Sequence, residues 1–172
     1  LKSLIKFSKK HYSPIKIALV VSNNKYANGL NFAKKNKIKS KFFNFKNRKN
    51  SESKILNDLK KNKIQLICLA GFMKILSKNF IKKFKGKILN IHPSLLPKYK
   101  GLNTHKRVIA NKEVFSGCTV HVVNSKLDSG KIILQKKIKI SKNDDHTTLG
   151  KKVLKQEHLL YPKAIKKLLT NL

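Results

Sequence analysis

The chain has 172 residues, a length that fits one ordinary domain and leaves little room for a second core. Hydrophobic residues make up 40% of it, which is enough for a folded core and excludes wholesale disorder. Lysines interrupt every apolar stretch before it reaches the roughly 18 residues that a membrane span needs. We therefore expect a soluble, cytoplasmic protein with no membrane segment.

The net charge of +34 is the unusual feature of the composition, because a small soluble domain usually carries a charge of about 2 to 8. Such a charge raises one hypothesis, a non-enzymatic basic protein that binds polyanions. Yet only Arg48 and Arg107 are arginines, and arginine is the side chain best suited to grip phosphates and bases. The lysines are spread along the chain, so a lysine-coated surface is the preferred interpretation and nucleic acid is not the expected partner.

The first part of the chain alternates helical and strand-like patterns. Apolar residues at helical spacing indicate helices, and short β-branched runs that end in turn residues indicate buried strands. Serine or asparagine before a helical run is typical of an N-cap. The expected elements are a helix over 1–10, a strand over 15–21, a helix over 27–36, a strand over 42–45 and a helix with Ser51 as its N-cap.

The alternation continues in the second part of the chain. The expected elements are a strand over 64–70, a helix capped by Ser77, strands over 87–91, 118–123 and 132–140, and a helix over 147–169 that is interrupted near Pro162. Apolar strands that alternate with helices are typical of a mostly parallel sheet covered on both faces. The predicted fold class is therefore α/β, as a single domain over residues 1–172 with a Rossmann-like, mostly parallel twisted sheet.

Asn90 and His92 form the most informative pair of side chains. Alternate side chains of a strand project to the same side, so these two share one side of the predicted strand. Pro93 ends the strand, which places the pair at its carboxyl end, where open α/β sheets bind ligands. An amide beside an imidazole can polarise a carbonyl, stabilise the oxyanion formed on attack and pass a proton. The alternative is a strand-end histidine that bonds only to the backbone.

Residues 90–101, NIHPSLLPKYKG, and the following LNTH resemble the signature of the folate-dependent formyltransferase family. Three further stretches resemble the glycinamide ribonucleotide formyltransferases of this family, in the same order and at similar spacing. They are LAGFMKILS at 69–77, LDSGKIILQ at 127–135 and QEHLLYP at 156–162. The resemblance extends from residue 1 to about residue 169.

The resemblance implies the Rossmann-like formyltransferase fold and a one-carbon transfer. The implied reaction moves a formyl group from 10-formyltetrahydrofolate, as cosubstrate, to the amino group of glycinamide ribonucleotide in de novo purine biosynthesis. Both partners would be small molecules. Another folate-dependent formyltransferase or a formyltetrahydrofolate deformylase is the alternative within the same family.

The resemblance also implies that Asn90, His92 and Asp128 are the catalytic residues. A carboxylate near an imidazole favours the charged form of the ring, so His92 could polarise the formyl oxygen as an imidazolium. Asn90 would help to hold the developing oxyanion. The alternative for Asp128 is an acid in a turn before Gly130 that accepts hydrogen bonds from the backbone.

Further binding residues are implied by the same resemblance. Glu157 corresponds to an acid that binds the ribose hydroxyls of the nucleotide, although a surface salt bridge is its alternative. Core packing is the alternative for Met73 and Leu76, and a solvated surface charge is the alternative for Arg48. The implied folate-binding set is Arg48, Met73, Lys74, Ile75, Leu76, Asn90 and Asp128.

Several kinds of site are not expected. Histidines and cysteines do not occur at metal-ligand spacing, so no metal site is predicted. Cys68 and Cys118 are expected to be buried free thiols. Leu1 corresponds to the residue just after the phosphate-binding loop of the family, so we expect that the family's first strand and that loop are missing from the sequence.

Overall fold

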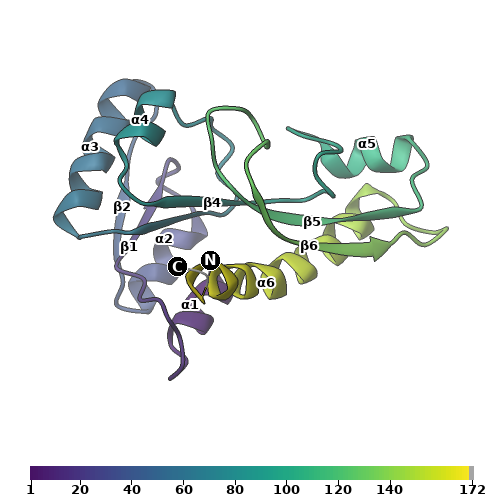
Figure 1. The fold of residues 1–172 in the computed structure, drawn as a ribbon, viewed down its shortest axis with the longest axis horizontal. Helices are drawn as coiled ribbons and strands as arrows, with labels where there is room; N and C mark the ends of the chain where they lie inside the picture. Colours follow the sequence, from purple (N-terminus) through teal and green to yellow (C-terminus); the bar gives the residue numbers. More distant parts are fainter. Residues whose placement is uncertain (171–172) are drawn as a thin grey trace. The chain divides into compact units, whose positions relative to one another are not determined.

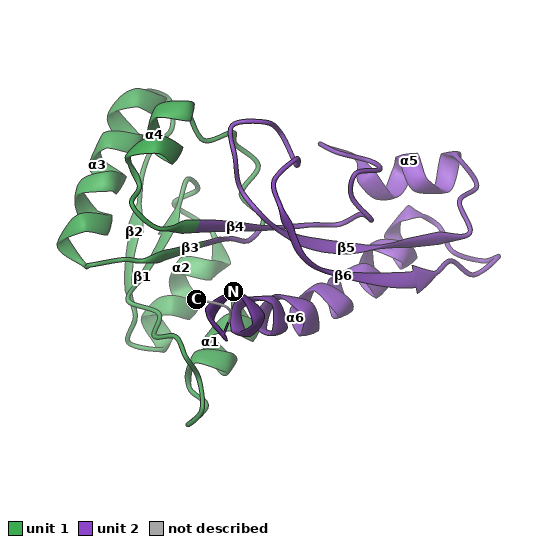
Figure 2. Cartoon of the chain, viewed as in Figure 1, with its two compact units in different colours: residues 1–67, 71–87 green, residues 68–70, 88–172 purple. Residues whose placement is uncertain are grey.

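The computed structural model describes residues 1–170 and resolves the chain into two compact units (Figures 1 and 2). Unit 1 comprises residues 1–67 and 71–87, and unit 2 comprises residues 68–70 and the chain from residue 88 onward. The chain passes from unit 1 to unit 2 within strand β3 (Leu66–Leu69), returns to unit 1 after residue 70, and enters unit 2 again at the start of β4 (Lys87–His92). The single-domain organisation expected from the sequence stays a prediction.

Unit 1 is built around a short parallel pair of strands. β1 (Leu19–Ser22) pairs with β2 (Lys39–Phe42), so that Leu19 lies opposite Lys39. Helix α2 (Asn28–Lys35) packs on both strands and buries Leu30 and Ala33. The remaining helices of the unit are α1 (Lys2–Ser8), α3 (Arg48–Lys61) and α4 (Lys78–Lys83).

Unit 2 contains most of a four-stranded sheet with the order β3-β4-β5-β6. Strand β5 (Phe115–Val122) runs antiparallel to both β4 and β6 (Ile132–Lys139). The long helix α6 (His146–Thr170) packs against β5 and β6, and α5 (Thr104–Ala110) packs against α6. The core between them is fully buried and apolar, with Val120, Leu149, Val153, Ala164 and Ile165 at its centre.

The α/β class expected from the sequence is confirmed, but the larger sheet is mixed rather than mostly parallel. The connection between β5 and β6 spans only residues 123–131. Parallel neighbours need a crossover of about a dozen residues or more, whereas antiparallel neighbours can be joined by a short loop. The loop length therefore requires the antiparallel pairing that the apolar character of the strands alone does not reveal.

Two elements of unit 1 begin earlier in the sequence than expected. The strand expected over 42–45 is β2, three residues earlier, because its lysines disguise the strand pattern. Helix α3 begins one turn before Ser51, and its N-cap is Asn47, whose side chain accepts a hydrogen bond from Asn50 N at 3.0 Å. Ser51 is instead buried and donates to the carbonyl of Asn44 at 2.6 Å.

Helix α6 is continuous, contrary to the expected interruption near Pro162. A proline inside a helix costs about 3 kcal/mol because it removes one hydrogen bond and crowds the preceding turn. The residues around it offset that cost, since burial of a large apolar side chain contributes about 1.5–3 kcal/mol. Leu160, Tyr161, Ala164 and Ile165 are all buried on this part of the helix.

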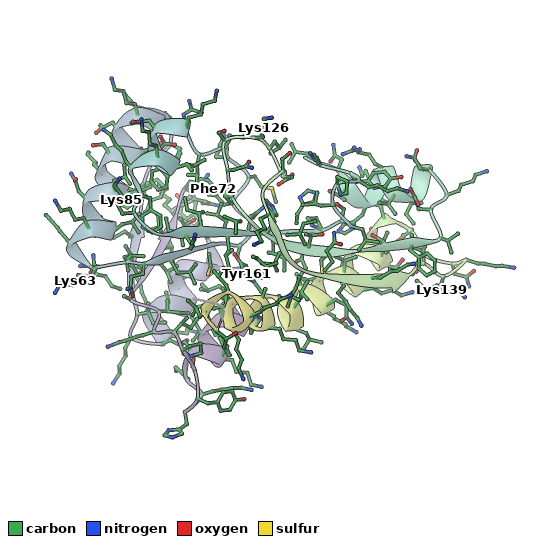
Figure 3. The ribbon with its side chains drawn as sticks, in the orientation of Figure 1. Lys63, Phe72, Lys85, Lys126, Lys139 and Tyr161 are labelled. Carbon is green, nitrogen blue, oxygen red and sulfur yellow. The ribbon has the colours of Figure 1, made fainter. Side chains whose placement is uncertain are left out.

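The lysines cover the outside of both units. Lys63 and Lys85 in unit 1, and Lys126 and Lys139 in unit 2, extend outward from the ribbon (Figure 3). They come from different elements and do not form one stripe along a single helix. Within residues 1–170, no helix is long and apolar enough to cross a membrane.

Candidate active site

The tip of β4 carries Asn90 and His92 as the sequence predicts. The antiparallel register places Asn90 opposite His121 and His92 opposite Thr119. The register between β5 and β6 shifts at Val120 and His121. Such β-bulges are common beside active sites, where they redirect a side chain. Strand pairing therefore adds a second histidine to the pair that the sequence pattern identified.

His92 lies between two hydrogen-bond acceptors in the structure. Its Nε2 is 2.8 Å from the carbonyl oxygen of Tyr99, and its Nδ1 is 3.3 Å from Oδ2 of Asp128. A neutral imidazole has one N–H, so the ring can donate to both acceptors only as an imidazolium. With an acceptor at each ring nitrogen, the imidazole is held in a fixed orientation beside the Asp128 carboxylate.

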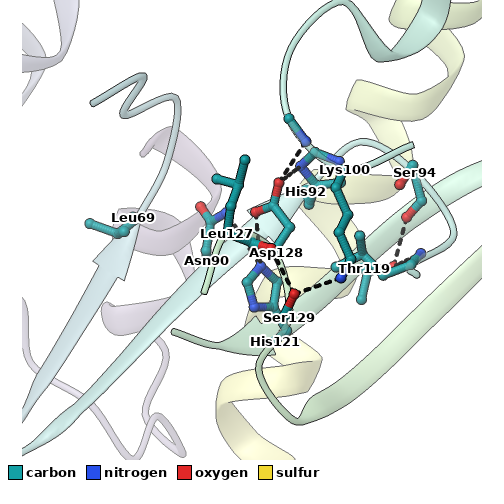
Figure 4. A network of polar contacts seen from close by, with 12 residues as sticks. Leu69, Asn90, His92, Ser94, Lys100, Thr119, His121, Leu127, Asp128 and Ser129 are labelled. Atoms are coloured by element: carbon teal, nitrogen blue, oxygen red, sulfur yellow. Dashed lines mark hydrogen bonds and ion pairs between the residues drawn. The ribbon is translucent and has the colours of Figure 1, made fainter. Parts of the chain in front are cut away.

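Asp128 is the centre of the polar cluster (Figure 4). Its carboxylate lies 3.3 Å from His92 and 3.6 Å from Nε2 of His121, and it accepts a hydrogen bond from Gly101 N at 2.9 Å. Burial would raise the pKa of this carboxyl, but the contact with His121, the Gly101 N–H and the charges of both histidines outweigh it and lower the pKa to about 2. Asp128 is therefore ionised at neutral pH although it is only 9% exposed.

The loop that carries Asp128 is fixed by a close backbone approach. Gly130 lies so near the carbonyl of Val122 that an added Cβ would be 1.6 Å from that oxygen. Only glycine allows this contact, which brings the loop after β5 back against the strand. Asp128 itself has a φ of 43°, in the left-handed region. The turn before Gly130 thus serves to aim the carboxylate at His92 and His121, not only to close the loop.

The amide of Asn90 reaches the same cluster at Nε2 of His121, the nitrogen that also faces Asp128. Its Nδ2 is 3.4 Å from Nε2 of His121, while Nδ1 of His121 is 3.0 Å from the carbonyl of Val122. The structure therefore brings His92 and Asp128 together and adds His121, which is 2% exposed, as the residue that contacts both Asp128 and Asn90. Sequence reasoning missed His121, and the signal that could have found it is its place opposite Asn90 in an antiparallel pairing.

Thr119, on β5, anchors the proline-rich loop that follows β4. The hydroxyl of Thr119 donates to the carbonyl of Ser94 at 2.6 Å and accepts from Leu96 N at 3.1 Å. Gln135 Nε2 donates to the same hydroxyl at 2.9 Å and to the carbonyl of Leu96 at 2.8 Å. These contacts, of which the two between Thr119 and the loop backbone are buried, satisfy the backbone of the loop and hold His92 at the strand end.

Glu157 lies on α6 in unit 2 and is half-buried. Within the described residues its carboxylate has no hydrogen-bond or ion-pair partner, so the expected alternative of a surface salt bridge is wrong. Burial raises the pKa of Glu157 to about 7. A partly desolvated carboxylate without a partner is well suited to accept hydrogen bonds from a ligand.

Apart from Asn90 and Asp128, the residues of the implied folate-binding set lie in unit 1. Met73 and Ile75 are in the connection between β3 and α4, with 72% and 63% of their surfaces exposed. Core packing, the alternative for Met73 and Leu76, is therefore wrong for Met73, whereas Leu76 is half-buried. Arg48 is the first residue of α3 and lines a hollow of about 370 Å³ together with Lys49 and Lys83.

The two cysteines take no part in the contacts of this cluster. Cys68 and Cys118 are free thiols, Cys118 is buried and Cys68 half-buried. Burial raises the pKa of Cys68 to about 11 and that of Cys118 to about 12, so both stay protonated at neutral pH. In the part of the chain that the structure describes, no group of three or more histidine, cysteine or acidic side chains is arranged to hold a metal ion.

Comparison with known proteins decides the family. Residues 1–165 match the formyl transferase family. This chain belongs to that family. Phosphoribosylglycinamide formyltransferase of Haemophilus influenzae is 45% identical over 156 residues, which cover 89% of this chain and 74% of that protein. The solved structure of phosphoribosylglycinamide formyltransferase from Anaplasma phagocytophilum is 37% identical, with a TM-score of 0.90 over 96% of this chain and 78% of that one.

Animal proteins of purine biosynthesis also match this chain. The trifunctional purine biosynthetic protein adenosine-3 of Gallus gallus is 42% identical over 168 residues. Those residues cover 96% of this chain but only 17% of that relative, so the chain spans a small part of its length. The resemblance to the glycinamide ribonucleotide formyltransferases, stated from the sequence motifs, is confirmed by these comparisons.

Proposed function

We propose that this chain transfers a formyl group from 10-formyltetrahydrofolate to the amino group of glycinamide ribonucleotide, and that it acts in the cytoplasm as the sequence analysis expects. The contact between Asp128 and His92, 3.3 Å between Oδ2 and Nδ1, is the observation that carries the proposal. It supports an imidazolium beside an ionised carboxylate at the end of a strand. Membership of the formyl transferase family supplies the reaction class.

In the proposed reaction the amine nitrogen of the nucleotide forms a bond to the formyl carbon, and an N–H of His92 donates a hydrogen bond to the formyl oxygen. The imidazolium stabilises the negative charge that develops there, and the amide of Asn90 adds a second donor. The bond between the formyl carbon and the folate nitrogen then breaks and the carbonyl re-forms. The amine loses one proton and the folate nitrogen gains one, and the negative charge of Asp128 stabilises the positive charge that the attacking amine carries until its proton leaves.

Asp128 has two effects in this scheme. Its charge stabilises the imidazolium form of His92, and its low pKa keeps it ionised throughout the neutral range. His121 contacts the same carboxylate at 3.6 Å and is the neighbour of Asn90. It therefore helps to fix the positions of both groups. A direct transfer is proposed, because neither serine labelled in Figure 4 donates its hydroxyl to a base: Ser129 Oγ donates to the carbonyl of Leu127 and Ser94 Oγ to the carbonyl of Lys98.

The binding assignments form part of the same proposal. We assign Glu157 to the ribose hydroxyls, since one carboxylate can accept from two neighbouring hydroxyls and this one has no partner in the described chain. The folate-binding set also stays a proposal. Its support is the exposure of Met73 and Ile75, which leaves apolar surface for a flat ring, and the positive charge of Arg48 for a carboxylate of the folate.

The proposal is tested by supplying 10-formyltetrahydrofolate to the purified chain with each acceptor in turn. We expect formyl transfer to glycinamide ribonucleotide and only slow hydrolysis when no amine is present. Hydrolysis as fast as transfer would instead identify a deformylase. The polyanion-binding alternative predicts tight binding of a DNA duplex that weakens steeply with salt and is unchanged by His92→Ala. That result without formyl transfer would overturn the proposal.

A further inference from the structure

The backbone of residues 99–103 adopts conformations that need support from other residues. Tyr99, Gly101 and Asn103 have φ values of 57°, 78° and 54°, all in the left-handed region. Glycine adopts this conformation readily, but tyrosine does so at a cost. Residues in such conformations persist when surrounding contacts determine them, and they gather at functional sites. The segment therefore depends on contacts from outside it.

This segment contacts both His92 and Asp128. The carbonyl of Tyr99 accepts the hydrogen bond from Nε2 of His92 at 2.8 Å. Two residues later, the N–H of Gly101 donates to Oδ2 of Asp128 at 2.9 Å. The same carboxylate oxygen lies 3.3 Å from Nδ1 of His92. A shift of the segment would consequently alter the surroundings of His92 and Asp128 together.

Arg107, on α5, holds the backbone of the same segment. Its Nη1 donates to the carbonyl of Lys100 at 2.7 Å and to that of Leu102 at 3.3 Å, the two carbonyls that flank Gly101. Its guanidinium carbon lies 5.4 Å from the centre of the Tyr99 ring. One side chain thus binds the backbone on both sides of Gly101 and covers the ring of Tyr99.

The ring of Tyr99 is itself fixed at its far end. Its hydroxyl donates to Oε1 of Glu113 at 2.8 Å and accepts from Nδ2 of Asn111 at 2.9 Å. Arg107 therefore stacks on an aromatic surface that other residues already hold in place. A planar guanidinium is suited to stacking and directed donation at once, whereas a lysine ammonium is a compact charge on a flexible stem. Arg107 is also one of only two arginines among 41 basic residues.

We propose that Arg107 is a positioning residue, which sets the geometry of His92 and Asp128 by clamping the segment over residues 99–103. Its effect on turnover depends on the proposed formyl transfer, but its effect on the Asp128 carboxylate does not. Without the clamp, the Gly101 N–H no longer points steadily at Asp128. The carboxylate then loses one of the contacts that stabilise its charge, and His92 loses its fixed acceptor at Tyr99.

The kinetic test compares three variants of the full chain. Arg107→Met keeps a long unbranched stem and removes every donor, and we expect kcat to fall about tenfold because small misplacements of reacting groups are costly. The KM values should stay within about twofold, since Arg107 contacts neither substrate in the proposed scheme. Arg107→Lys should lie between Arg107→Met and the unaltered chain. Lys106→Met, its exposed neighbour on α5, is the matched control and should behave as the unaltered chain.

The second readout is the ionisation of Asp128, followed by NMR of carboxyl carbons labelled in aspartate. The chain has only four aspartates, so their signals can be assigned by substitution. The groups that face Asp128 are His92 from β4, His121 from β5 and the N–H of Gly101. Between about pH 7 and pH 3 we expect Asp128 to stay ionised in the unaltered chain and in Lys106→Met. In Arg107→Met it should begin to gain a proton within that range.

The two readouts separate this inference from the proposed function. Thermal unfolding at neutral pH first establishes that each variant is folded. An Asp128 titration in Arg107→Met that matches the unaltered chain would overturn the positioning role, whatever the turnover. If the unaltered chain transfers no formyl group but Arg107→Met shifts the titration of Asp128, the proposed function fails and the positioning role stands.

Discussion

The cluster around Asp128 in unit 2 and the connection that carries Met73 in unit 1 are built in opposite ways. His92 and Asp128 are 5% and 9% exposed and are held by contacts within the chain, whereas Met73 and Ile75 are 72% and 63% exposed. Groups that the protein already orients can act on a transition state without being rearranged. Exposed apolar side chains contribute only when a ligand covers them. Changes in the first region should therefore act on kcat, and changes in the second on KM.

The strongest test of this contrast is His92→Ala. The variant removes the imidazolium between Asp128 and the Tyr99 carbonyl, so we expect kcat for formyl transfer to fall by about 10²–10⁴. The KM for the folate cosubstrate should change little. Steady-state kinetics with both substrates measures the two effects separately. His11→Ala is the matched control, because His11 is exposed in unit 1 and belongs to no site. Turnover near that of the unaltered chain would remove His92 from the mechanism.

Asn90→Ala should have the next largest effect. Loss of one donor to a developing oxyanion lowers kcat by about 10²–10³ in other enzymes. The variant also removes the neighbour of His121 Nε2, but it leaves the contact between His92 and Asp128 in place. We therefore expect a lower kcat with an unchanged Asp128 titration. A fall in kcat of less than about threefold would show that Asn90 is not a donor to the transition state.

Much of this cluster could be predicted from the sequence, because the relevant rules are local. Strand alternation places Asn90 and His92 on one side, and Pro93 fixes the strand end. The family motifs added Asp128, which local rules would have assigned to a simple turn. His121 could not be found in this way, since its place depends on the antiparallel register and on the bulge beside Val120. Register is a property of two strands and is not written in either one alone.

The errors in the predicted helices have the same cause, because tertiary contacts decide them too. Asn47 and Ser51 are both good N-cap residues, and the apolar periodicity that could choose between them begins only after Ser51. The buried contact of Ser51 with the Asn44 carbonyl, which settles the matter, is a tertiary feature. Likewise, Pro162 predicts a break when α6 is considered alone. The burial of Tyr161 and Ile165 against the core overrides that local preference.

Glu157→Gln tests a group that is neither buried and paired, as Asp128 is, nor largely exposed, as Met73 is. Glu157 is half-buried, unpaired within the described chain, and has a pKa raised to about 7 by burial. In the unaltered chain the KM for glycinamide ribonucleotide should rise as the pH falls below about 7, because the protonated carboxyl accepts fewer hydrogen bonds. Glutamine should raise this KM about tenfold at about pH 8, the loss of a hydrogen bond to a charged group. It should also abolish the pH dependence.

The stability of the same variant provides an independent check. A carboxyl with a higher pKa in the folded chain than in the unfolded chain lowers stability as the pH rises from about 4.5 to about 7. Glu157→Gln removes this cost, so it should raise the unfolding temperature at about pH 8 and leave it unchanged at about pH 4. Calorimetry at the two pH values measures the difference. Equal unfolding temperatures of variant and unaltered chain at both would show that Glu157 is not desolvated.

Met73→Ala should give the smallest effect, and it tests the other side of the contrast. If the Met73 side chain is covered by folate, its truncation removes apolar burial of about 1 kcal/mol, so the KM for the folate cosubstrate should rise roughly fivefold. The kcat should not change, because Met73 belongs to no part of the catalytic cluster. Tyr26→Ala is the matched control, since Tyr26 is 77% exposed in the same unit.

A fall in kcat with Met73→Ala would break the division between a preformed catalytic cluster and a ligand-dependent binding surface. It would mean that the connection between β3 and α4 takes part in the chemical step. An unchanged KM would instead remove Met73 from the folate site. A change in KM alone is expected because exposed apolar residues act only through the surface that a ligand covers, whereas buried polar residues act on the reacting atoms.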